Sequence, residues 1–158
     1  MIIDIYTHIY PNAYYEAMNR IAPQLENLGK RMRAVTKLHD LDERFREMDG
    51  YGDYRQIISL PQPPIEDVSS PEDGAELARV ANDAMAEMVA SHPDRFAGFV
   101  AAMCLHNMDA TLAEMQRAID DLGAKGVQIF TNIKGRPLDD PDFLPVFDAM
   151  AEYDLPIW

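Results

Sequence analysis

The stretch Ile2-Ile3-Asp4-Ile5-Tyr6-Thr7-His8 opens the chain as an apolar strand that ends in a histidine. In a parallel α/β fold, active sites are built at the carboxyl ends of the strands, which is where His8 falls. Side chains two apart on a strand share a face, so Tyr6 and His8 are expected to point the same way. A lone histidine at a strand end is more often structural, and a metal ligand is the alternative.

Strands and helices are expected to alternate along the whole chain. The expected strands are residues 2–8, 54–60, 96–105, 126–130 and 155–158. The expected helices are residues 11–33 with a kink at Pro23, 41–49, 70–91, 109–122 and 139–153. Such alternation with short connections indicates a parallel sheet with right-handed crossovers. Two α/β architectures fit it: an open doubly wound sheet, or a (β/α)8 TIM-type barrel represented by about its first four βα units plus the start of strand five.

Composition excludes several classes of protein. The net charge is −13, which repels phosphate backbones and makes nucleic-acid binding improbable. No apolar run approaches the roughly 18 residues of a membrane span. The single cysteine, Cys104, allows no internal disulfide and fits a reducing cytosol. We therefore expect a cytoplasmic protein with no nucleic-acid or membrane partner. Composition says little about a small-molecule substrate, and a homo-oligomeric state is possible.

Three segments carry a resemblance to a known family. The opening strand with Pro11 is similar to the apolar-Asp-apolar-His-x-His opening of the amidohydrolase-related family. The other two segments are Ser91-His92-Pro93-Asp94-Arg95-Phe96 and residues 125–158, from Lys125-Gly126-Val127-Gln128-Ile129 to Leu155-Pro156-Ile157-Trp158. The closest branch contains aminocarboxymuconate-semialdehyde decarboxylase and aromatic-acid decarboxylases.

The resemblance implies a metal-dependent barrel enzyme that hydrolyses or decarboxylates a small carboxylated or cyclic organic acid. Zn²⁺ is the expected metal and Mn²⁺ the alternative, because imidazole and carboxylate ligands suit both. Of the family's metal ligands, His8 is carried over to this sequence. Tyr6 occupies the usual position of the first histidine, where packing beside the metal or a hydrogen bond to a ligand is favoured over ligation, since a phenol has a pKa of about 10.

The later ligands of the family have no counterpart within these residues. We therefore expect residues 1–158 to be a single domain that forms the N-terminal half of such a barrel, apparently truncated. Residues 155–158 would then form an edge strand with exposed apolar side chains.

Further candidate site residues follow the third and fourth expected strands. His106 is a candidate substrate contact, and Asn107 beside it is an expected helix cap. In the loop after residue 130, Asn132, Lys134 and Arg136 are candidate substrate-binding residues. The two cations are suited to a substrate carboxylate, although a solvated basic loop explains them equally well.

Three hypotheses remain open from the sequence. The first is the metal-dependent enzyme, either hydrolase or carboxy-lyase. The second is a truncated or degenerate relative without a complete metal site or turnover. The third, an open flavodoxin-like binding domain, is disfavoured because no glycine-rich phosphate loop follows the first strand.

Overall fold

Short parallel strands form a curved layer in the computed structural model, which describes residues 1–158 except for the side chains at positions 26, 28 and 29. The strands are β1 (Ile2–His8), β2 (Tyr54–Ser59), β3 (Phe96–Phe99), β4 (Ala101–Ala102) and β5 (Val127–Gln128). Their order is β1-β2-β3 in one sheet and β4-β5 in the next. The segment β3–β4 joins the two sheets, because the N–H of Val100 donates to Ile58 and that of Ala101 donates to Gly126, each at 2.9 Å.

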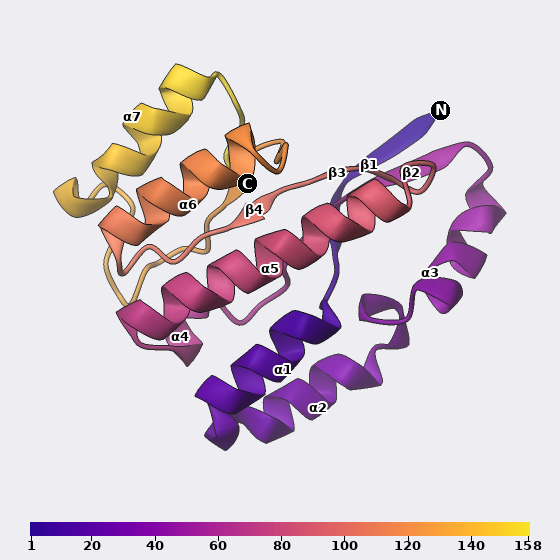
Figure 1. Cartoon of the computed structure of the whole chain (residues 1–158), viewed down its shortest axis with the longest axis horizontal. Helices are drawn as coiled ribbons and strands as arrows, with labels where there is room; N and C mark the ends of the chain where they lie inside the picture. The colour runs from indigo at the N-terminus through magenta and orange to yellow at the C-terminus, as the bar shows by residue number, and fades with distance from the viewer.

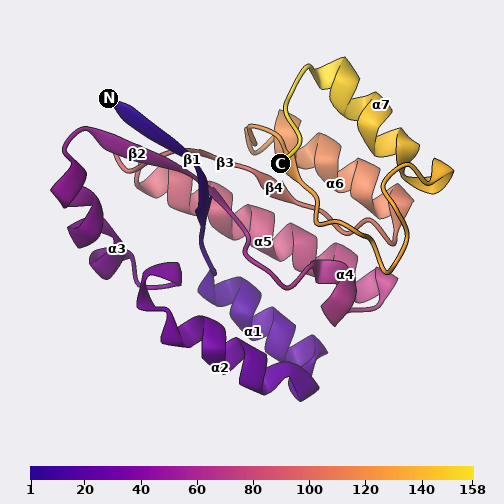
Figure 2. The same cartoon turned by 180° about the vertical axis from the view of Figure 1, so that it is seen from behind.

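The helices lie side by side along this layer (Figure 1). They are α1 (Asn12–Ile21), α2 (Glu26–Ala34), α3 (Leu41–Met48), α4 (Ile65–Val68), α5 (Pro71–Ser91), α6 (Met108–Asp120) and α7 (Leu144–Tyr153), with short 3-10 turns between some of them. Helix α5 contacts α1, β3, β4 and α6, and α6 in turn contacts α7. Figure 2 shows the same row from behind. Successive helices that pack on one another in sequence order form the outer ring of a barrel rather than the two faces of a doubly wound sheet.

Helix starts follow the capping residues in the sequence. Ser70 accepts a hydrogen bond from the N–H of Asp73, and Asn107 accepts one from that of Ala110. Asp140 likewise accepts from Asp142 at the turn before α7. The expected helix 11–33 restarts at the proline, as α1 ends at Ile21 and a 3-10 turn begins at Pro23.

Several expected elements differ in length from the structure. The single strand expected over 96–105 is divided into β3 and β4, and that expected over 126–130 is limited to β5. The division falls at Val100, where the hydrogen bonds change from Ile58 of β2 to Gly126 beside β5. Asn82 of α5 then ends β4, because its amide bonds both the N–H and the C=O of Ala102, at 2.8 and 3.1 Å. A side chain thus takes the place of a neighbouring strand there. The short helix α4 was not expected from the sequence.

Residues 155–158 lie parallel to β5 but make little regular strand. The N–H of Trp158 donates to Val127 and that of Ile129 donates to Trp158, at 2.8 and 2.9 Å. Gly126 permits this approach, since a Cβ there would collide with the carbonyl of Pro156 and the Trp158 ring. The Trp158 indole also donates to the carbonyl of Ile5 in β1, at 2.9 Å.

The core fills the space between the strands and the row of helices. Its largest fully buried side chains include Leu77 and Met85 from α5, Phe96 and Phe99 from β3, and Met115 from α6. Cys104 is buried as well, as its position in an apolar run suggests. Apolar burial of this extent is the main term that stabilises the layer against its helices.

Exposed apolar side chains gather on β1. Ile2 and Ile5 are each 57% exposed and Tyr6 is 63% exposed, whereas Ile157 is 36% exposed. We expected an exposed apolar edge at residues 155–158, but the apolar side chains of β1 are more exposed than those residues. No helix within the described part of the chain is long and apolar enough to cross a membrane.

Candidate metal and substrate site

A shift of strand register re-aims the end of β1. Asp4 lies opposite Gln56 of β2, but Thr7 lies opposite Ile58, so β1 advances three residues while β2 advances two. Such an extra residue turns the side chains that follow it to the other face. Asp4 therefore lies on the face of Gln56, whereas His8 lies opposite Ser59 on the other face.

Tyr6 and His8 share one face, as their spacing predicts. Their ring centroids are 5.1 Å apart with the rings edge to face. The Tyr6 side chain is largely exposed, and the His8 side chain is half-buried. The phenol therefore packs on the imidazole in this structure.

Hydrogen bonds assign the proton of the His8 ring. Its Nδ1 lies 2.9 Å from the Ser59 hydroxyl, and that hydroxyl donates to the carbonyl of Thr7 at 3.2 Å. With its one proton directed at Thr7, the Ser59 hydroxyl accepts from His8, and this arrangement places the ring proton on Nδ1. Nε2 then carries a lone pair, and it has no hydrogen-bond partner among the described residues. This tautomer is the one that a metal-ligating histidine needs.

Buried Arg44 of α3 holds the backbone at the end of β1. Its guanidinium donates to the carbonyls of His8 and Lys37, at 2.7 and 3.0 Å, and to the side chain of Gln56 at 2.7 Å. Desolvation lowers the pKa of Arg44 to about 10, so the group stays charged at neutral pH. Burial, and then the charge of Arg44, lower the pKa of His8, which favours a neutral ring that can bind a metal.

His106 follows β4 and has a different environment. Its Nε2 lies 3.2 Å from the carbonyl of Ser69, which can only accept, so Nε2 carries the proton. Its Nδ1 lies 3.1 Å from the sulfur of Cys104 and accepts from the thiol. Burial raises the pKa of Cys104 to about 12, which keeps the thiol protonated. Both ring nitrogens of His106 are thus occupied by the protein.

The loop after β5 places its three candidate substrate residues differently. Asn132 is exposed, and its side-chain oxygen accepts from the N–H of Gly135 at 2.9 Å within the turn. Arg136 forms ion pairs with Asp140 and Asp142, at 2.7 and 2.5 Å. Lys134 donates to the backbone carbonyl of Glu66 at 2.9 Å. Of the two cations, Lys134 is the one without a carboxylate partner among the described residues.

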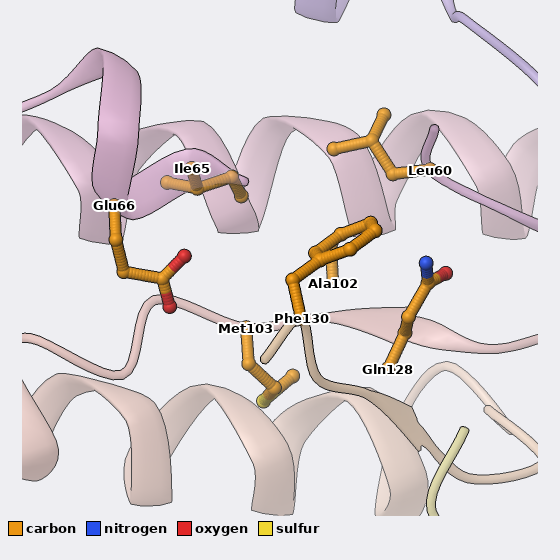
Figure 3. Close-up of a pocket in the computed structure, with 7 residues that line it drawn as sticks. All are labelled: Leu60, Ile65, Glu66, Ala102, Met103, Gln128 and Phe130. Atoms are coloured by element: carbon orange, nitrogen blue, oxygen red, sulfur yellow. The ribbon is translucent and has the colours of Figure 1, made fainter. Parts of the chain in front are cut away.

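A small pocket lies beyond β2 and β4, and it holds two polar residues that the sequence analysis missed. Its lining comprises Leu60, Ile65, Glu66, Ala102, Met103, Gln128 and Phe130 (Figure 3). Glu66 and Gln128 are both buried. The available signals were a glutamine within the apolar run Val127-Gln128-Ile129 and a glutamate two residues after Pro64.

The described donors do not form a complete metal site by themselves. No group of three or more His, Cys, Asp or Glu residues able to hold an ion occurs among the described residues. His8 fits a single ligand position, because its Nε2 lone pair is free. A catalytic zinc site needs three protein ligands as a rule, so a complete site requires donors beyond this set.

Comparison with known proteins identifies the lineage of the chain. Residues 3–157 match the amidohydrolase family. The chain is 35% identical over 123 residues to gamma-resorcylate decarboxylase of Rhizobium radiobacter, which covers 74% of this chain and 37% of that protein. It is 31% identical over 121 residues to 2-amino-3-carboxymuconate-6-semialdehyde decarboxylase of Dictyostelium discoideum, covering 76% and 33% of the two chains.

A solved structure agrees with these matches. The dihydroxybenzoic acid decarboxylase of Polaromonas sp. JS666, with bound manganese and the inhibitor 2-nitroresorcinol, superposes with a TM-score of 0.77 at 25% identity. The match covers 99% of this chain and 48% of that one. The chain therefore spans about a third of the length of these curated relatives, corresponds to their N-terminal part, and has the α/β fold of part of a TIM-type barrel. It belongs to the amidohydrolase family.

Proposed function

We propose that the protein takes part in the metal-dependent, non-oxidative decarboxylation of a hydroxylated aromatic acid. The observation that carries the proposal is His8, a neutral imidazole with a free Nε2 at the carboxyl end of β1. The relatives named above are decarboxylases, which favours a carboxy-lyase over a hydrolase. In this reaction the bond from the ring to the carboxylate breaks, the ring carbon takes up a proton, and CO₂ leaves.

In this proposal His8 supplies one ligand to a divalent cation. The manganese of the related structure supports Mn²⁺, and Zn²⁺ remains an alternative that the same ligand accepts. A bound divalent ion would neutralise negative charge on the substrate. Tyr6 packs on the His8 ring and shields one side of it. Further ligands come from outside the described set of donors, consistent with residues 1–158 acting as the N-terminal half of a barrel.

Lys134 is our candidate for the substrate carboxylate. Its ammonium is held near Glu66 through a backbone carbonyl and keeps donors to spare, since a lysine has three. Arg136 is less suited to this role because two aspartates already neutralise it. Asn132 and His106 shape the same end of the barrel in this proposal. A homo-oligomeric state and a cytoplasmic location remain predictions.

The test measures the metal content and the CO₂ release of the protein expressed from its own gene. Loaded with Mn²⁺ or Zn²⁺, the protein should convert 2,6-dihydroxybenzoate to resorcinol. Chromatography measures this conversion. His8→Asn should lower the metal content at least about 10-fold and abolish CO₂ release, whereas His39→Asn should change neither. Equal metal content in wild type and His8→Asn would contradict the ligand role.

A non-catalytic relative is the second candidate, because the described residues contain one suitable ligand. In that case the wild-type protein would retain no metal after dialysis and release no CO₂ from any hydroxybenzoate. Restoring the family pattern with Tyr6→His would then bring no gain in metal binding. A gain in metal binding with Tyr6→His would instead favour the metal-dependent enzyme.

A further inference from the structure

One peptide group of β1 lies outside the pairing of the strands. Ile5 and Tyr6 are the two residues of β1 that the register with β2 skips. The carbonyl of Ile5 and the N–H of Tyr6 belong to the same peptide group, so both of its polar atoms bond outside the β1–β2 ladder. This group directly precedes the residues whose side chains form the candidate site.

The Asp4 side chain supplies the partner of the N–H. Its Oδ1 accepts from the N–H of Tyr6 at 3.2 Å, a contact two residues along the chain that the short side chain of aspartate readily makes. Its Oδ2 accepts from the hydroxyl of Tyr54 at 2.6 Å, which fixes the carboxylate against β2. One carboxylate therefore ties the skipped residues to the neighbouring strand.

The Trp158 indole supplies the partner of the carbonyl. Its Nε1–H donates to the carbonyl of Ile5 at 2.9 Å. The backbone of Trp158 is itself held beside β5, since its N–H donates to the carbonyl of Val127 at 2.8 Å. The peptide group is thus bound on both sides, by its own strand and by the segment that lies next to β5.

We propose that Asp4 and Trp158 are positioning residues that hold the extra residue of β1 and thereby keep the His8 ring on the face of the site. Side chains alternate along a regular strand, so without the extra residue His8 would lie on the same face as Asp4. Both residues act through the backbone, and neither is a ligand in this proposal. The inference deepens the proposed function, and it rests on that function only for the identity of what His8 binds.

NMR of the metal-free full chain tests the geometry without any reaction. Asp4→Ala should speed hydrogen exchange of the Tyr6 amide about 10-fold, and it should weaken the nuclear Overhauser effect between the rings of Tyr6 and His8. Asp4→Asn keeps an oxygen in the place of Oδ1 and should restore both signals. Unchanged exchange at Tyr6 together with an unchanged ring contact in Asp4→Ala would overturn the inference.

Mn²⁺ binding connects this geometry to the site. The affinity of Asp4→Ala should be at least about 10-fold lower than that of the wild type, as for other residues that orient a metal ligand. Asp4→Asn should bind Mn²⁺ as the wild type does, and so should Asp148→Ala, which removes an exposed carboxylate from α7. If the wild type binds Mn²⁺ and Asp4→Ala binds it equally well, the inference is wrong.

A second variant covers the case in which Asp4→Ala does not fold. Trp158→Phe keeps an aromatic ring and removes the donor to Ile5, so it should weaken the contact between the Tyr6 and His8 rings and lower the Mn²⁺ affinity about fivefold. No change in either measurement contradicts the inference.

The same measurements separate this inference from the proposed function. A wild type that binds no Mn²⁺, with a ring contact that Asp4→Ala weakens, would remove the proposed function and leave the positioning role standing. A wild type that releases CO₂, with an Asp4→Ala variant that keeps both the ring contact and the metal affinity, would do the reverse.

Discussion

The end of β1 and the end of β4 each present a histidine, and the two are prepared for different tasks. At β1, one ring nitrogen of His8 donates to Ser59 and the other stays free. At β4, His106 donates to Ser69 and accepts from Cys104, which leaves neither nitrogen for a ligand. The backbones are held by comparable buried polar side chains, Arg44 at the first and Asn82 at the second. The difference indicates that the partners of a strand-end histidine, rather than its position, decide which ring nitrogen is left free for a ligand.

The largest expected effect comes from removing the side chain that holds β4. Asn82→Ala leaves the N–H and C=O of Ala102 buried without partners and also removes a bond to Glu114. The free energy of unfolding should fall by about 3–4 kcal/mol in urea denaturation. The exposed variant Glu87→Ala on the same helix should change it by less than about 0.5 kcal/mol. A loss below about 1 kcal/mol for Asn82→Ala would show that β4 does not depend on this amide.

The matching change at β1 is Arg44→Met, which keeps much of the apolar stem and removes the donors to His8, Lys37 and Gln56. We expect a loss of about 2–3 kcal/mol in the free energy of unfolding, since several buried acceptors lose their donor. Arg46→Met, on the exposed side of the same helix, is the control and should be nearly neutral. An unchanged midpoint of urea denaturation for Arg44→Met would show that the end of β1 does not depend on the hydrogen bonds from this helix.

A smaller effect on stability and a specific effect on the ring are expected from Ser59→Ala. Without the acceptor at Nδ1, the His8 proton is no longer restricted to that nitrogen, so Mn²⁺ affinity should fall about 10-fold or more. The nitrogen-15 chemical shifts of the His8 ring should change from values typical of a single tautomer to values typical of a mixture of tautomers. Ser69→Ala, at the other histidine, should leave both readouts unchanged. A single unchanged tautomer in Ser59→Ala would refute the assignment.

The smallest effect is a pH dependence at Glu66. Burial raises its pKa in the folded state, so the folded protein binds this proton more tightly than the unfolded chain does. The wild type should therefore lose stability as pH rises through the folded pKa. Glu66→Gln should match the wild type near pH 4 and have a higher free energy of unfolding than the wild type near pH 8. The free energy of unfolding of the exposed variant Glu87→Gln should vary with pH as that of the wild type does. The same pH dependence for Glu66→Gln would contradict the expectation.

Much of this architecture is legible in local sequence signals. Ser70, Asn107 and Pro23 mark helix boundaries because capping and the missing proline N–H act within a few residues. The early end of the third expected strand, at Ala102, was not predictable in this way. It depends on Asn82, whose contact with Ala102 spans twenty positions and needs the helix already packed on the strand.

The candidate site also contains residues that local sequence signals predict and residues that they do not. His8 stood out because a strand-end histidine is a local pattern, and the family resemblance raised its interest further. Gln128 and Glu66 were missed because their significance lies in a pocket that the fold assembles from three strand ends. The pairing of Arg136 with Asp140 lies four residues apart and was open to prediction from spacing alone.

The extra residue in β1 has a consequence for comparing this protein with its relatives. In a regular strand Asp4 and His8 would face the same way, yet here they face opposite sides, and only the residues after the shift look toward the site. The strand thus behaves as two independently aimed halves. Loss of one residue between Asp4 and Thr7 would preserve the helix-facing half and rotate the histidine out of the site. Relatives that differ in length at this point should therefore be aligned from the histidine backwards, because counting from the N-terminus would pair side chains of opposite faces.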